Sequence, residues 1–106
     1  MIEKFLAMLE SGADNALLRY SLGNAYFGEQ QYSQAIEHLK IAVEHDNGYS
    51  AAWKLHGRCH FELSQFEEAV DVYDQGILIA TEKGDKQAVK EMQVFRRRAA
   101  KQLQSE

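Results

Sequence analysis

The sequence Leu22-Gly23-Asn24-Ala25-Tyr26, followed by Tyr32 and Ala35, decides the fold, because its pattern of residue sizes returns 34 positions later. The positions that are identical in the two copies are Gly23 and Gly57, Phe27 and Phe61, Gln31 and Gln65, and Ala35 and Ala69. Between these identities, small residues align with small, aromatic with aromatic, and β-branched with β-branched residues. A fixed period of this length is typical of proteins in which one small unit stacks on the next.

Each copy contains two stretches whose apolar residues recur every three or four positions, which predicts helices. These predicted helices cover about residues 16–29, 33–45, 50–63 and 66–81. The order Ser64-Gln65-Phe66-Glu67 has the spacing of a capping box, which marks a helix start. Gly48 is expected to take a left-handed conformation after the second helix, and Gly84 is expected to close the fourth. Each copy is therefore predicted to be a helix hairpin.

Two further helices are predicted outside the repeats, at residues 2–11 and 86–103. Phe5 and Leu9 lie one repeat period before Leu39 and Val43, so the N-terminal helix matches the second helix of an incomplete repeat. Fewer than three repeats are poorly stable alone, so we expect these flanking helices to close the core. The predicted organisation is one domain over residues 1–106, with repeats at 16–49 and 50–83.

Glycine inside a helix costs about 1 kcal/mol relative to alanine, so a glycine repeated at a fixed place indicates a packing constraint. Helices approach closely only where the side chains at the crossing are small. We expect Gly23 to meet Ala35, and Gly57 to meet Ala69, at the crossing of each hairpin.

The composition predicts a folded protein and disfavours nucleic acid and membrane surfaces as partners. Apolar residues make up 45% and charged residues 26% of the chain, and the net charge is -4. General nucleic-acid and membrane-surface binders are more often basic, so we expect neither partner. The single cysteine, Cys59, cannot form an internal disulfide, which favours the cytoplasm. The N-terminal residues contain no long apolar run, so neither a signal peptide nor a membrane span is predicted.

The residues at matching places are Leu22, Gly23, Tyr26, Tyr32, Ala35, Leu39 and Ala42 in the first copy and Trp53, Gly57, Phe66, Ala69, Tyr73 and Gly76 in the second. Over about residues 16–83 this pattern resembles the tetratricopeptide repeat, whose unit is a helix hairpin of the same length. The resemblance implies an all-α fold, a short right-handed solenoid of about six antiparallel helices. Departures from the family pattern are Arg19 at a usual tryptophan, and His56 and His60 at usual leucine and tyrosine positions.

In a stack of this kind, the first helices of successive repeats lie side by side and line a concave groove. The predicted partner-binding residues on this face are Tyr20, Asn24, Phe27, Lys54, Arg58 and Phe61. The first three share one helix face by their spacing, and the last three are their counterparts one repeat period later. Such a face suits an extended peptide or a helix of acidic or carboxylate character. The alternative is that the aromatic rings only pack and that the cations are solvated surface charges.

Some members of the family hold a C-terminal carboxylate with lysine and asparagine side chains on the first helices. Asn24 matches one of those positions, but Tyr20 stands where the lysine would be, and Leu55 where an asparagine would be. A clamp of that kind is therefore not expected here.

His56 and His60 are four residues apart on one predicted helix, a spacing that can bind a metal ion. No second cluster of ligands appears in the sequence, Cys59 is expected to point elsewhere, and both histidines occupy packing positions of the family. We therefore expect structural histidines and no metal site.

The run Arg96-Arg97-Arg98 with Lys101 is expected to form the solvated face of the last helix, with Glu91 nearby. Positive charge is favourable near the C-terminus of a helix, where this run lies. Contact with nucleic acid or an acidic partner is the alternative reading.

The sequence contains no catalytic motif, and neither enzymatic activity nor a cofactor is expected. The predicted function is a cytoplasmic interaction module that binds a peptide or protein segment in the concave groove. The alternative is a structural protein that forms homodimers through its exposed repeat ends and binds no peptide.

Overall fold

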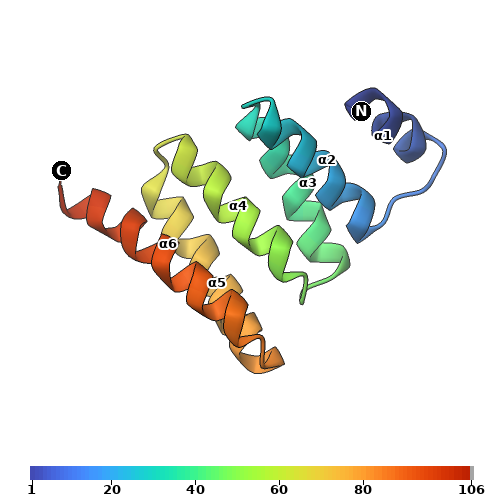
Figure 1. Cartoon of the computed structure of the whole chain (residues 1–106). Helices are drawn as coiled ribbons and strands as arrows, with labels where there is room; N and C mark the ends of the chain where they lie inside the picture. Colours follow the sequence, from blue (N-terminus) through green and yellow to red (C-terminus); the bar gives the residue numbers. More distant parts are fainter. Residues whose placement is uncertain (106) are drawn as a thin grey trace.

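The computed structural model describes residues 1–105, in which six α-helices and no strands occur. The helices are α1 (Ile2–Glu10), α2 (Ala16–Gly28), α3 (Tyr32–His45), α4 (Ser50–Glu62), α5 (Phe66–Lys83) and α6 (Lys86–Gln104). Figure 1 shows them as an extended stack in which consecutive helices pack against each other. The all-α prediction is confirmed, and the helix ends lie within two residues of those predicted.

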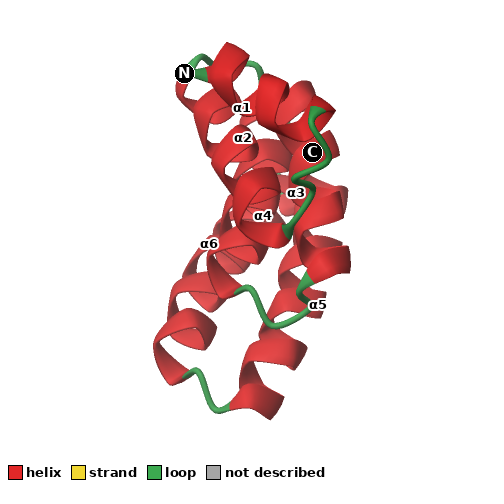
Figure 2. Ribbon diagram, turned by 90° about the vertical axis from the view of Figure 1, so that its right-hand side faces the viewer, coloured by secondary structure: helices red, strands yellow, loops and turns green. Residues whose placement is uncertain are grey.

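The helices form two layers. Figure 2 shows α2, α4 and α6 toward one side of the stack and α3 and α5 toward the other. The hairpins α2–α3 and α4–α5 are the two complete repeats, and α4 contacts both α2 and α6. The first helices of the repeats and the last helix of the chain therefore share one face, as the groove prediction requires.

A glycine lies at the crossing of each hairpin, as predicted, but a large side chain covers it. A Cβ atom built on Gly23 would lie 2.5 Å from Leu39 Cγ, and one on Gly57 would overlap the ring of Tyr73. Both Leu39 and Tyr73 are fully buried. The glycines thus make room for a leucine and a tyrosine, one helical turn beyond the alanines that we expected at these contacts.

The core runs through the middle of the stack. Its largest fully buried side chains are Tyr73, Leu22, Leu39, Met92 and Cys59. The N-terminal helix α1 contacts α2 but has no fully buried residue, whereas α6 buries residues against α5 and α4. The two flanking helices therefore extend the core unequally. None of the helices in residues 1–105 is long and apolar enough to cross a membrane.

The turn inside each repeat differs from the capping box that the sequence suggested. Ser64 has a φ of 59° and makes no capping hydrogen bond; Gln65 precedes α5 instead. Gln30, at the matching place in the first repeat, has a φ of 60°. In both turns the next amide donates to a carbonyl five residues earlier, Gln31 to Tyr26 at 2.9 Å and Gln65 to His60 at 2.9 Å. In each repeat, a polar residue in the left-handed conformation therefore makes the turn, and the amide of the next residue donates a hydrogen bond to a carbonyl of the helix end.

The expectation for Gly48 is also wrong. Among the described residues, the glycines with a positive φ are Gly12 and Gly84. The backbone amide of Gly48 instead donates to the Asp46 carboxylate at 3.1 Å, so an Asx-type turn ends the first repeat. Gly84 closes α5 with a φ of 81°, as predicted.

Candidate partner-binding groove

Two hollows lie next to each other on one side of the stack, which we call the groove face: one is formed by α2, α4 and α6, and the other by α2 with Met1 and α1. One has a volume of about 260 Å³ and is lined by Tyr20, Ala51, Lys54, Leu55, Arg58, Glu91 and Phe95. The other has a volume of about 250 Å³ and is lined by Met1, Phe5, Tyr20, Ser21, Asn24 and Ala25. Tyr20 lines both, so the hollows adjoin at its side chain. The first is charged and the second is largely apolar.

Arg58 is held between aromatic rings of two neighbouring helices. Its guanidinium carbon lies 5.4 Å from the centroid of the Phe27 ring on α2 and 5.1 Å from that of Phe95 on α6. Its Nη2 lies 3.9 Å from Glu62 Oε2, and both side chains are more than a third exposed, so this ion pair is weak. The guanidinium carbon of Arg98 also lies 5.1 Å from the centroid of the Phe95 ring. Stacking fixes the Arg58 side chain while its N–H groups stay available for hydrogen bonds.

Lys54 is not a free cation. Its ammonium donates to Glu91 Oε1 at 2.8 Å, and both side chains are partly exposed. Glu91 and Phe95 are groove residues that the sequence reasoning missed. The signal that could have found them is their i, i+4 spacing on the last helix, which places them on one face.

The two predicted phenylalanines pack at the hairpin turns. Phe27 meets Tyr32 edge to face with centroids 5.5 Å apart, and Phe61 meets Phe66 in the same way at 5.2 Å. Phe27 still contributes to the groove face by stacking on Arg58, whereas Phe61 lines neither hollow. The other four predicted residues all line one hollow or both.

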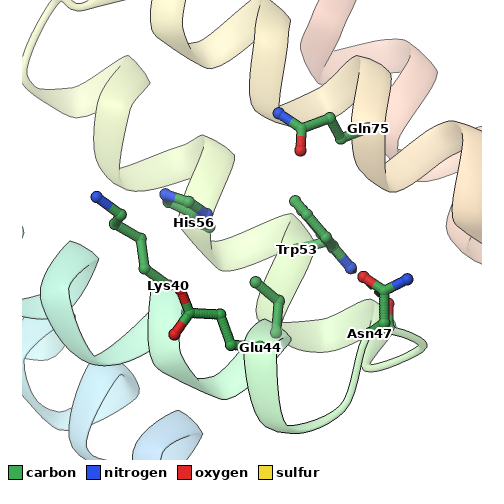
Figure 3. Close-up of a pocket in the computed structure, with 7 residues that line it drawn as sticks. Lys40, Glu44, Asn47, Trp53, His56 and Gln75 are labelled. Carbon is green, nitrogen blue, oxygen red and sulfur yellow. Dashed lines mark hydrogen bonds between the residues drawn. The ribbon is translucent and has the colours of Figure 1, made fainter.

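A third hollow lies on the opposite side, between α3 and α5. Its volume is about 460 Å³, and Figure 3 shows Lys40 and Glu44 on one wall, with Trp53 and His56 of α4 and Gln75 of α5 around the rest. Trp53 Nε1 donates to the Asn47 carbonyl oxygen at 2.8 Å. This hydrogen bond and the burial of Trp53 tie the floor of the hollow to the loop before α4.

His56 is buried in the core, and His60 contacts the hairpin turn. His56 is 7% exposed, its Nδ1 has no hydrogen-bond partner, and burial lowers its pKa to about 4. His60 Nδ1 lies 2.7 Å from Gln65 Oε1 at the hairpin turn. Within residues 1–105, no three potential ligands from His, Cys, Asp and Glu gather closely enough to hold a metal ion. Burial raises the pKa of the Cys59 thiol to about 12, so it is a poor nucleophile.

The arginines of the C-terminal run point to different surroundings. Arg96 forms an ion pair with Asp74 of α5, and Arg98 lies over the Phe95 ring. Arg97 is exposed. The run is therefore divided between helix packing, the groove face and solvent.

Comparison with known proteins finds a matching family model and a close relative of the chain. A family model described as "Anaphase-promoting complex, cyclosome, subunit 3" matches residues 1–76. A TPR repeat-containing protein of Pseudomonas aeruginosa, PA0015, is 45% identical over 98 residues, which cover 92% of this chain and 93% of that protein.

Solved structures agree with this match. The solution structure of BPP2914 from Bordetella parapertussis has a TM-score of 0.84 at 39% identity, covering 96% of this chain and 89% of that one. The second TPR domain of human RPAP3, determined in complex with the HSP70 peptide SGPTIEEVD, has a TM-score of 0.72 at 30% identity, covering 89% and 77%. With its fixed repeat period, its stacked hairpins and these relatives, the chain belongs to the tetratricopeptide-repeat family.

Proposed function

We propose that this chain binds a segment of another protein on the groove face, with ligand carboxylates against Arg58 and Lys54. The observation that carries the proposal is the pair of adjoining hollows that share Tyr20. Domains of this family generally mediate protein–protein interaction, and the RPAP3 domain holds a peptide that contains two consecutive glutamates.

The chemistry of the two hollows defines the ligand. Arg58 offers hydrogen-bond donors at a defined place, because its guanidinium carbon lies 5.4 and 5.1 Å from the centroids of the Phe27 and Phe95 rings. Charge-assisted hydrogen bonds to a carboxylate are about twice as strong as neutral ones. The hollow beside α1, with Met1, Phe5 and Ala25, suits an apolar side chain. The ligand is therefore an extended segment with a carboxylate and an apolar side chain, oriented by the Tyr20 ring between them.

Lys54 adds selectivity to this arrangement. A ligand carboxylate that approaches Lys54 competes with Glu91 for its ammonium. The exchange of one exposed ion pair for another gains little free energy, so Lys54 contributes less than Arg58. We expect no lysine and asparagine clamp of the family's kind in this groove, since Tyr20 and Leu55 occupy two of its positions.

Selection from short random peptides displayed on phage, followed by fluorescence anisotropy with the enriched peptides, tests the proposal. The groove variant is Lys54→Glu with Arg58→Glu, and the matched control is Lys40→Glu with Lys101→Glu, which makes the same charge change at exposed positions elsewhere. We expect enriched peptides to contain Asp or Glu, and their affinity to fall by at least about tenfold in the groove variant alone.

Three results would contradict the proposal: no peptide is enriched, the groove variant binds as wild type does, or both variants lose binding equally. Circular dichroism of each variant establishes that the fold is intact.

A further inference from the structure

Helices α4 and α6 contact each other through one side chain in each successive turn of α4. Ser50 Oγ donates to Asp85 Oδ2 at 2.8 Å. One turn later, Lys54 Nζ donates to Glu91 Oε1 at 2.8 Å. After a further turn, the guanidinium of Arg58 lies over a phenylalanine ring of α6. Because three separate contacts join the two helices, a change at one of them leaves the other two in place.

The middle contact brings a carboxylate into the groove. Glu91 and Lys54 both line the charged hollow, together with Arg58. Their side chains are 42% and 34% exposed, so the ion pair is open to a ligand. The carboxylate of Asp85, in contrast, accepts from the Ala88 amide at 3.2 Å and caps the start of α6. Glu91 therefore occupies, from within the chain, the position that a ligand carboxylate would take against Lys54.

Buried neighbours on both helices hold the two partners of this ion pair in place. On α6, Met92 follows Glu91 and is fully buried, and Ala88 is 2% exposed. On α4, Trp53 precedes Lys54 and is 6% exposed. The backbones that carry the two charges are therefore anchored in the core, and the ion pair can open by rotation of its side chains alone.

A ligand carboxylate at Lys54 meets both a competitor and a repulsive charge. The lysine ammonium has three N–H donors, and Glu91 accepts from one of them. A second carboxylate could use another donor, but it would then lie close to the first, and like charges at such a distance repel. Displacement of Glu91 would exchange one exposed ion pair for another, with little gain in free energy. By either route, Glu91 reduces what a ligand carboxylate gains at Lys54.

The second cation of the hollow lacks a competitor of this strength. Beside Arg58, α6 places the ring of Phe95 where it places a carboxylate beside Lys54. The ion pair of Arg58 with Glu62 is long, at 3.9 Å, and weak. Arg58 is therefore ready to receive a ligand carboxylate, whereas Lys54 is already engaged by one from the chain itself.

We propose that Glu91 is an autoinhibitory residue that sets the specificity of the groove, standing in for a ligand carboxylate at Lys54. This inference rests on the proposed function, because it concerns how the same groove selects acidic segments. The wild-type groove gains its affinity for acidic residues at Arg58 and discriminates little between segments with one acidic residue and segments with two. Once the Glu91 carboxylate is removed, Lys54 receives the second acidic residue.

The variant Glu91→Gln tests this proposal. Glutamine keeps the length of the side chain, and its amide can accept from Lys54 while it donates to a ligand carboxylate. The matched control is Glu44→Gln, which removes the same charge from an exposed residue on the opposite side of the stack. Short random peptides displayed on phage are selected on wild type and on both variants. Fluorescence anisotropy then measures the enriched peptides, together with versions in which each Asp or Glu is replaced by its amide.

We expect peptides enriched on the Glu91→Gln variant to carry a second acidic residue. They should bind this variant about two- to fivefold more tightly than wild type or the control, which is the effect of one exposed ion pair. The gain should vanish when the second acidic residue is replaced by its amide. It should also vanish when Lys54→Met is added to Glu91→Gln. A residue with only a structural role would not produce this dependence on the ligand charge.

Unchanged affinity of the Glu91→Gln variant, an equal gain in the control, or a gain that survives Lys54→Met would overturn the inference. If these results accompany loss of binding in Arg58→Glu, the proposed function stands without it. If Arg58→Glu binds as wild type does while Glu91→Gln still binds more tightly, the role of Arg58 is wrong and that of Glu91 stands. Enrichment on Glu91→Gln alone would support the inference, whereas no enrichment on any of the proteins would contradict both proposals.

Discussion

Replacement of Gly57 by alanine is expected to destabilise the protein, against the direction of helix propensity. Gly57 lies inside α4, where alanine is favoured over glycine by about 1 kcal/mol. A Cβ at this position would overlap the Tyr73 ring, which is fully buried and stacks on Phe95 with centroids 6.3 Å apart. A shift of the buried ring would therefore disturb its contact with Phe95 of α6.

The magnitude follows from these two opposing effects. Overpacking of a dense core costs about 1–3 kcal/mol and occasionally more. A rigid ring under direct overlap belongs at the upper end of that range, so the net loss of unfolding free energy is about 2 kcal/mol after the propensity gain. For a domain of this size, such a loss lowers the midpoint of thermal unfolding by about 10 °C.

Thermal and urea unfolding of three glycine-to-alanine variants measures this effect. A Cβ at Gly28, the last residue of α2, would have no neighbour within 4 Å, so Gly28→Ala is expected to stabilise by up to about 0.5 kcal/mol. A Cβ at Gly23 would meet Leu39, whose side chain can change rotamer, so Gly23→Ala is expected to cost less than Gly57→Ala.

The expected order of stability is Gly28→Ala, wild type, Gly23→Ala and Gly57→Ala. If Gly57→Ala unfolds at the same midpoint as Gly28→Ala, or above it, the argument that Tyr73 requires the glycine is refuted. The double variant with Tyr73→Leu supplies an internal check, since the cost of the alanine should shrink when the ring is absent.

Four further changes are expected to alter stability in a defined direction. Asn15→Ala should lower the urea-unfolding free energy by about 1 kcal/mol, because the Asn15 side chain accepts a hydrogen bond from the Leu18 amide at 2.8 Å at the start of α2. Ser64→Gly should raise it by about 0.5 kcal/mol, because Ser64 adopts a left-handed φ and makes no cap. His56→Leu should reduce the loss of thermal stability between pH 6.5 and about 4, because burial lowers the pKa of His56 to about 4 and the unfolded chain takes up the proton first. Asp14→Asn should reduce the loss of stability as pH falls from 3.8 to about 2, because the hydrogen-bonded Arg19 guanidinium lowers the pKa of Asp14 to about 2 and protonation removes that interaction; melting curves across this range measure it.

The number, order and type of the helices follow from the sequence, because those signals are local or strictly periodic. Apolar residues at intervals of three and four produce a helix with one apolar face wherever they occur. The repeat step from Gly23 to Gly57 then produces the same hairpin with the same crossing. Four of the six predicted partner-binding residues line the hollows for the same reason: equivalent positions on stacked first helices face the same side.

The turns were less predictable. Ser64 and Glu67 have the spacing of a capping box, yet the chain places Ser64 in a left-handed conformation and makes no such cap. Phe61 packs edge to face on Phe66 across this turn, as Phe27 packs on Tyr32 across the first, and Gln30 in that first turn has the same left-handed φ although no serine precedes the helix. Phe61 lies at the hairpin turn for that reason rather than in either hollow.

Sequence periodicity by itself determined the stacked hairpins, since side-chain size at fixed intervals dictates which helices can cross. Only the tertiary structure decided the surroundings of the groove cations. The repeat period of 34 does not lead from Lys54 to Glu91 or from Arg58 to Phe95, because α6 lies outside the two repeats; only the packing of α6 beside α4 sets Glu91 against Lys54 and Phe95 against Arg58. Burial likewise depends on the neighbouring helices and not on the repeat position alone: Met8 is 42% exposed, whereas Ala42, one repeat period later, is fully buried.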